Sequence, residues 1–116
     1  MLRVTNPTRG TDLGTRIRLA DAYWSRLRGL LGRTGLEPGE GLLISPSRGV
    51  HMFGMRFAID VLLLDEDRRV RKLFPALAPG QNTGMHRGIR YALELPVGVI
   101  ETSRTQEGDE LIWTRS

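Results

Sequence analysis

The stretch that decides the fold is Ile59-Asp60-Val61-Leu62-Leu63-Leu64-Asp65-Glu66-Asp67-Arg68. Six residues rich in aliphatic side chains, followed by a charged turn, are typical of a strand that enters a hairpin. The second strand of this hairpin is expected over residues 69–74, where basic and apolar residues alternate imperfectly. Because side chains of a strand alternate between its two faces, Asp60 should share a face with Leu62 and Leu64.

Outward from this hairpin, the chain alternates short apolar segments with turns. Their patterns predict further strands at 2–5, 16–19, 41–45, 90–95 and 111–114. One amphipathic helix is expected near residues 21–32, because Asp21 can cap it and an apolar stripe follows at helical spacing. The loop over 75–88 is long for a compact domain, and such loops often carry function. About seven short strands and one helix predict a mainly β fold, either a β-sandwich or a partly closed barrel.

The composition is that of one globular domain spanning residues 1–116. The hydrophobic fraction is 40% and the charged fraction is 26%, close to ordinary globular usage. No apolar run approaches the roughly 20 residues that span a bilayer, so we expect no membrane association. Residues 1–7 lack the apolar stretch of a signal peptide, and the chain has no cysteine. A cytoplasmic location is therefore expected.

Arginine dominates the charge of the chain. Sixteen of the seventeen basic residues are Arg, Lys72 is the exception, and the net charge is +4. Guanidinium groups bind phosphate well, so an RNA-associated basic protein is one alternative function. The arginines are scattered along the sequence, whereas nucleic-acid binding expects a patch. This scatter favours a general composition bias, and only weak, non-specific binding of nucleic acid is expected.

One segment carries a family resemblance. Residues 51–65 read His51-Met52-Phe53-Gly54-Met55-Arg56-Phe57-Ala58-Ile59-Asp60-Val61-Leu62-Leu63-Leu64-Asp65. Four further segments support it, at 28–33, 39–43, 90–98 and 108–111. Together, and in this order along the chain, the segments resemble the signature of the family called domain of unknown function 192. The resemblance implies a compact β-sandwich of jelly-roll type with a helix, and it implies no activity. Ala58 and Gly54 depart from the family pattern, where Pro and Trp are usual, so any pocket here should differ in shape.

The candidate ligand site is a groove between segments 51–60 and 75–88. Arg56 would clamp an anionic or carbonyl group, and Asp60 would orient it. Asp60 is also expected to be shielded from solvent, accepting hydrogen bonds from Arg56 or from backbone N–H groups of the 51–57 loop. The full candidate set is His51, Met55, Arg56, Asp60, Met85, His86 and Glu94.

Glu94 and the histidines leave further alternatives open. Glu94 is expected to face solvent, although a pair with Asp60 would suit glycosidase-like acid/base chemistry. His51, His86 and Asp60 could form a two-histidine, one-carboxylate metal site if the two loops converge. No close ligand pair is present in the sequence, so we expect no metal and no other cofactor.

The sequence therefore predicts a non-catalytic ligand-binding or accessory module, with an unknown small ligand or protein as its partner. A hydrolase-type enzyme that uses Asp60 with His51 or a metal is one alternative, and the RNA-associated protein is the other. No elbow motif or Gly-rich phosphate loop is present to support catalysis.

Overall fold

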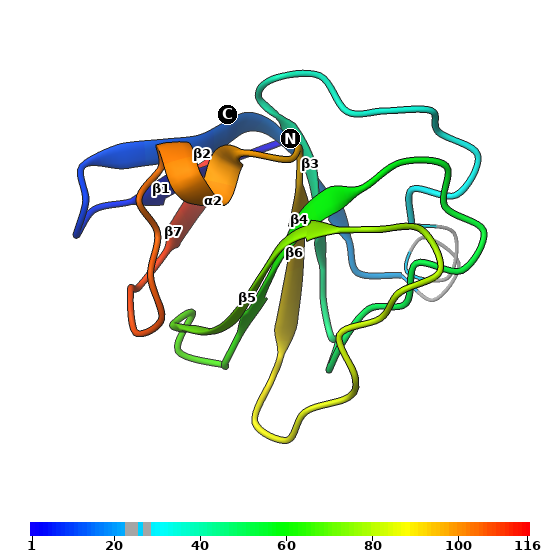
Figure 1. Cartoon of the computed structure of the whole chain (residues 1–116). Coiled ribbons are helices and arrows are strands. Elements are labelled where there is room, and N and C mark those ends of the chain that lie inside the picture. The colour runs from blue at the N-terminus through cyan, green and yellow to red at the C-terminus, as the bar shows by residue number, and fades with distance from the viewer. Residues whose placement is uncertain (23–25, 27–28) are drawn as a thin grey trace.

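The chain folds around a curved β-sheet (Figure 1). The computed structural model describes residues 1–22, 26 and 29–116. Its elements are β1 (Leu2–Asn6), β2 (Thr11–Ala20), β3 (Glu40–Ile44), β4 (Ile59–Leu64), β5 (Val70–Leu77), β6 (Tyr91–Leu95), α2 (Val99–Thr102) and β7 (Ile112–Arg115).

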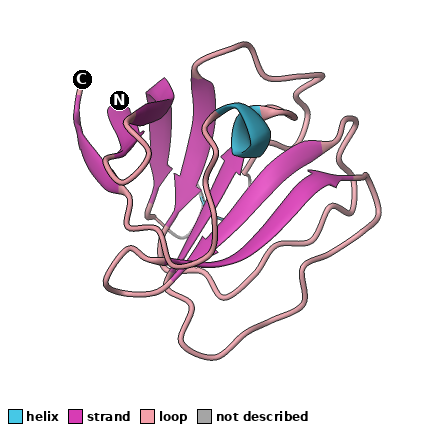
Figure 2. Cartoon of the chain, turned by 60° about the vertical axis from the view of Figure 1, so that its left-hand side comes forward, coloured by secondary structure: helices cyan, strands magenta, loops and turns pink. Residues whose placement is uncertain are grey.

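The seven strands of the described residues form one mixed sheet in the order β5-β4-β6-β3-β2-β1-β7. Strands β2 and β3 run parallel, and the other neighbours run antiparallel. The parallel pair is possible because the connection over 21–39 is long enough for a crossover. The mainly β fold with about seven strands is confirmed. The jelly-roll arrangement stays a prediction, since all these strands belong to one continuous sheet, whose curvature Figure 2 shows.

Both faces of the sheet are buried at β4, which explains the apolar run from Val61 to Leu64. All six residues of β4 are buried. Leu62 and Leu64 belong to an apolar cluster on the face we call concave, where residues from both ends of the sheet meet. Val61 and Leu63 belong to a second cluster on the opposite face. We call this the loop-covered face, because residues of the connections between strands pack on it, among them Leu30, Met52 and Ile89.

The two ends of the sheet approach each other, so the sheet closes in part into a barrel. The Val70 N–H donates to the Asp109 carbonyl oxygen over 2.9 Å, and the Leu111 N–H donates to the Arg68 carbonyl oxygen over 2.9 Å. These bonds connect the start of β5 to the segment that precedes β7. One of the predicted alternatives, a partly closed barrel, describes this arrangement.

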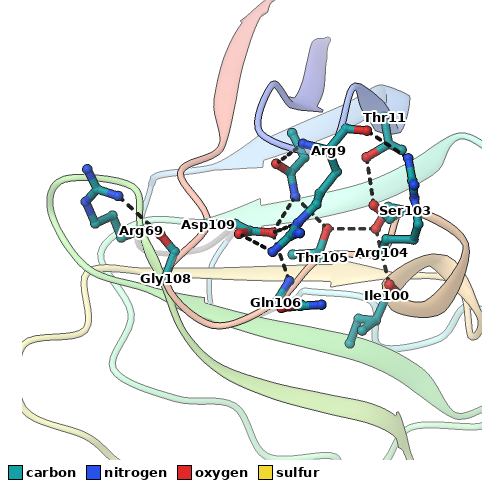
Figure 3. A network of polar contacts seen from close by, with 11 residues as sticks. Arg9, Thr11, Arg69, Ile100, Ser103, Arg104, Thr105, Gln106, Gly108 and Asp109 are labelled. Carbon is teal, nitrogen blue, oxygen red and sulfur yellow. Dashed lines mark hydrogen bonds and ion pairs between the residues drawn. The ribbon is translucent and has the colours of Figure 1, made fainter.

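A network of polar side chains stabilises the segment that precedes β7 (Figure 3). The Asp109 carboxylate accepts hydrogen bonds from Arg9 Nε (3.0 Å), Asn6 Nδ2 (3.0 Å) and the Gln106 N–H (3.0 Å). The Arg9 guanidinium, the Asn6 amide and the Gln106 N–H lower the pKa of Asp109 to about 2. The ionised carboxylate therefore links the β1–β2 turn to the chain between α2 and β7.

The helix expected near residues 21–32 lies partly outside the described residues. Residues 23–25 and 27–28 lie outside the described residues. Arg26 is helical, and its N–H donates to the Ala22 carbonyl oxygen over 2.9 Å. The segment 29–32 forms turns instead of helix, because Gly29 and Gly32 adopt positive φ angles of 49° and 84°. The expected helix therefore does not extend to residue 32.

The β4–β5 hairpin is confirmed, but β5 is longer than predicted. It runs to Leu77 through Pro75, so the loop expected over 75–88 begins later. Proline lacks an N–H and is tolerated here because β5 is an edge strand of the sheet. None of the helices in the described part of the chain has the length and apolar character that crossing a bilayer requires.

Candidate functional site

A cavity of about 520 Å³ opens on the loop-covered face of the sheet. Two residues of the sheet contribute to it, Ile44 of β3 and Glu94 of β6, which lie on neighbouring strands. The other described residues that line it are Arg26, residues 29–31, residues 46–51, Met55 and Met85. A concave, mainly apolar space of this size is typical of a site for a small molecule.

Two loops that are distant in sequence join beside this cavity. The Val50 N–H donates to Thr83 Oγ1 (2.8 Å), and the Thr83 N–H donates to the Val50 carbonyl oxygen (2.9 Å). The pairing continues where the Met52 N–H donates to the Gln81 carbonyl oxygen over 2.7 Å. Segments 51–60 and 75–88 do converge, but hydrogen bonds join them directly. The cavity therefore lies beside their junction and not in a groove between them.

Gly49 permits this junction to form. A Cβ atom at position 49 would lie 2.0 Å from the Gly84 carbonyl oxygen and 2.8 Å from Thr83 Oγ1. Any larger residue would push the two loops apart, so the close approach requires glycine. Because Gly49 also lines the cavity, the glycine that joins the loops helps to shape the site.

Glu94 is a buried carboxyl group that has no hydrogen-bond partner in the described part of the chain. The residue is 4% exposed, and its side chain accepts no hydrogen bond from any described residue. Each fully occluded polar side-chain atom in the described chain has a partner. The carboxyl oxygens of Glu94 therefore reach solvent through the cavity that the residue lines. The expectation that Glu94 faces bulk solvent is wrong, because loops cover this face of β6.

Burial alone perturbs the ionisation of Glu94. Loss of solvation raises the pKa of its carboxyl group from 4.5 to about 7, and no cation among the described residues offsets the rise. Arg26, Arg48 and His51 also line the cavity, yet none forms an ion pair with Glu94. Burial therefore disfavours the ionised form of Glu94.

Asp60 has the opposite environment and lies on the opposite face. It is 1% exposed and pairs with Leu95 on the concave face, whereas Glu94 pairs with Val61. Its carboxylate accepts three backbone hydrogen bonds, from the N–H groups of Ala76 (2.9 Å), Gly98 (3.1 Å) and Ile100 (2.9 Å). The predicted shielding of Asp60 is confirmed. Its predicted partners are wrong, since the donors lie in β5 and at the start of α2, not in Arg56 or the 51–57 loop.

A bulge in the hairpin explains why Asp60 finds these donors. Between the pairs Ile59–Leu77 and Val61–Phe74, one residue of β4 faces two of β5. The extra residue leaves the Ala76 N–H outside the ladder, and the Asp60 carboxylate accepts it. The same carboxylate caps α2, which has no capping side chain of its own. Asp60 is therefore a structural residue, and the sheet separates it from Glu94, so the two do not form the carboxylate pair considered above.

The cavity brings together four of the seven candidate residues: His51, Met55, Met85 and Glu94. Arg56 is exposed and does not line it. His86 lines a separate cavity of about 470 Å³, and its Nε2 lies 2.7 Å from the Thr83 carbonyl oxygen. In the described ranges, no three His, Cys, Asp or Glu side chains come close enough together to hold a metal ion. His51, His86 and Asp60 therefore do not form the metal site considered above.

Sequence reasoning missed the lining residues Arg26 and Arg48 and the wall at 29–31. Arg48 is exposed, and its guanidinium group makes no hydrogen bond or ion pair with a described residue. The only local signal was the small-residue turn around it, Ser47-Arg48-Gly49. That turn points to the cavity only once the pairing of Gly49 with the distant loop is known.

Comparison with known proteins places this fold in a family. Residues 4–113 match the model of the DUF192 family, described as an uncharacterized ACR. The UPF0127 protein of Thermococcus sibiricus is 35% identical over an alignment 116 positions long, which covers 93% of this chain and 72% of the relative. The UPF0127 protein of Pyrococcus furiosus is 33% identical, with 95% of this chain and 97% of the relative covered. A crystal structure of a protein of unknown function from Novosphingobium aromaticivorans shares the fold, with a TM-score of 0.81 at 23% identity over 97% of this chain and 83% of that chain. The resemblance seen in segments 28–111 is thus confirmed, and the chain belongs to the DUF192 family.

Proposed function

We propose that the chain is a non-catalytic binding module for a small molecule, which occupies the cavity on the loop-covered face. The observation that carries this proposal is Glu94, a buried carboxyl group that has no partner among the described residues and lines the cavity. A buried acidic group without a partner lowers stability. Packing therefore does not explain why Glu94 is acidic. Its position in a cavity of ligand size suggests that the carboxyl group binds a ligand.

The surrounding residues support binding more than catalysis. The apolar side chains of Leu30, Ile44 and Met55 supply contact area, and Glu94 supplies a single buried polar anchor. Asp60, the carboxylate on which the hydrolase alternative depends, is saturated by three backbone donors on the other face of the sheet. We place the module in the cytoplasm as part of the same proposal, since a chain without cysteine suits a reducing compartment.

A screen with a residue-level readout tests this function. Amide chemical shifts of the ¹⁵N-labelled protein would be recorded against sets of amino acids, organic acids, amines, sugars and nucleotides. We expect at least one set to shift the amides of residues 29–31 and 46–51 saturably. Shifts only at distant amides, or none in any set, would contradict a small-molecule site here. Leu31→Trp, at an exposed position that lines the cavity, should weaken binding by occupying the space, whereas Val97→Trp, exposed outside the lining, should not.

A further inference from the structure

We infer that the ligand is amphoteric, with an ammonium group that reaches Glu94 and an anionic group that reaches Arg48 at the other end of an apolar chain. This inference rests on the proposed function, because it specifies the chemistry of the molecule that the cavity binds.

The ammonium end follows from what Glu94 lacks. Among the described residues, none donates a hydrogen bond to its carboxyl group and no cation compensates its burial. A neutral hydroxyl or amide donor would supply a hydrogen bond but no charge. An ammonium group supplies several N–H donors together with the missing positive charge, so it matches the ionised carboxylate best.

The apolar chain follows from the walls. Besides its charged residues, the cavity presents the aliphatic and thioether side chains of Leu30, Ile44, Val50 and Met55. These walls offer few polar partners, so the part of the ligand that crosses them should be hydrocarbon. Met55 is unbranched and adaptable, which suits contact with a methylene chain.

The anionic end follows from the positive charges in the lining. Among the described residues, the charged or titratable ones that line the cavity besides Glu94 are Arg26, Arg48 and His51. Arg26 donates to the Asp21 carbonyl oxygen over 2.8 Å, whereas the Arg48 side chain makes no hydrogen bond or ion pair with a described residue. These groups would repel a second ammonium group, which argues against a diamine. A carboxylate at that end would instead form a charge-assisted bond with Arg48.

A series of analogues isolates each end of the ligand. The probes are 6-aminohexanoate, which carries both charges, hexylamine without the carboxylate, hexanoate without the ammonium group, and 1,5-diaminopentane with two ammonium groups. Affinities would be measured from the amide shifts of residues 46–51 at pH 8, where Glu94 is ionised. We expect 6-aminohexanoate to bind at least tenfold more tightly than hexanoate and more tightly than either amine. Its affinity should rise between pH 6 and pH 8, because binding needs the carboxylate form.

Three variants connect the probes to the residues. Glu94→Gln should weaken 6-aminohexanoate at least tenfold and leave hexanoate unchanged. Arg48→Gln should weaken 6-aminohexanoate several-fold and leave hexylamine unchanged. Arg56→Gln is the matched control, since Arg56 is exposed and does not line the cavity, and it should change neither affinity.

The outcomes separate this inference from the proposed function. If hexanoate shifts the same amides as tightly as 6-aminohexanoate, the amphoteric ligand is refuted while a small-molecule site stands. If no probe of the series shifts these amides, the inference is also refuted, and the broader screen decides the function on its own. An affinity of 6-aminohexanoate that survives Glu94→Gln would overturn the assignment of the ammonium group to Glu94.

Discussion

Replacing Glu94 by glutamine should make the protein more stable at alkaline pH and leave its stability in acid nearly unchanged. Burial raises the pKa of Glu94 from 4.5 to about 7 in the folded chain. Below about pH 4.5 the carboxyl group is protonated in both states and contributes no difference. Between pH 4.5 and 7 the folded state holds a proton that the unfolded state has released, so the free energy of unfolding falls as the pH rises.

The size of the effect follows from the same linkage. Each tenfold change in proton affinity is worth about 1.4 kcal/mol, so a rise from 4.5 to about 7 corresponds to about 3 kcal/mol once Glu94 is ionised. The wild-type free energy of unfolding should therefore lose up to about 3 kcal/mol between pH 4 and pH 8.5 that Glu94→Gln does not lose. The glutamine amide in this variant keeps the shape of the side chain without the charge, so the cavity should stay intact.

Urea unfolding of the two proteins at several values of pH would measure this difference. Trp113 is a suitable fluorescence reporter, because it packs against the concave core and its ring centroid lies 4.9 Å from that of Tyr91. Glu101→Gln, on the exposed surface of α2, controls for the removal of one carboxylate. The reasoning is refuted if the stability difference between Glu94→Gln and wild type is the same at pH 4 as at pH 8.5.

Three further substitutions test the fold around the site. Asp109→Asn should lower the free energy of unfolding by about 1–3 kcal/mol at pH 7. Because the folded pKa of Asp109 is held at about 2, this loss of stability should shrink as the pH falls from about 4 towards 2, which urea melts of both proteins would measure. Asp60→Ala should destabilise by about 1–3 kcal/mol or more, because three backbone donors lose their acceptor, and Asp60→Asn should cost less; thermal melts that rank the two equally would contradict the capping role. Gly49→Ala should separate the paired loops and speed hydrogen exchange at the amides of Val50 and Thr83, and unchanged protection there would argue against the required close approach.

Sequence patterns predicted the parts of the fold that local alternation decides. The faces of β4 could be assigned from the sequence because the side-chain period of a strand is two, and Asp60 does share the concave face with Leu62 and Leu64. The β4–β5 hairpin was equally local, since a charged turn separates its two strands. Its bulge was not predictable, because the register depends on where Pro75 and Ala76 fall against β4.

The parts that remained hidden depend on contacts between distant segments. Val50 and Thr83 are far apart in the sequence, and no pattern in either loop predicts the hydrogen bond between them. Burial of Glu94 has the same origin. A polar residue that alternates with apolar ones in a strand is typical of a face exposed to solvent. On β6 that face is covered by loops, so the pattern gave the correct face and the wrong environment.

Asp60 and Glu94 are both buried, yet their carboxyl groups have opposite effects on the fold. Both are buried carboxyl groups on adjacent strands, and their neighbours in the sequence are equally aliphatic. Asp60 accepts three backbone hydrogen bonds that would otherwise be unmade, so its charge stabilises the fold. Glu94 accepts none from the residues that the structure describes, and its ionisation opposes folding. Glutamine or an aliphatic residue at position 94 would give a more stable protein, and sites that sacrifice stability in this way are characteristic of function. This contrast supports the proposal that Glu94 acts by binding a molecule that enters the cavity.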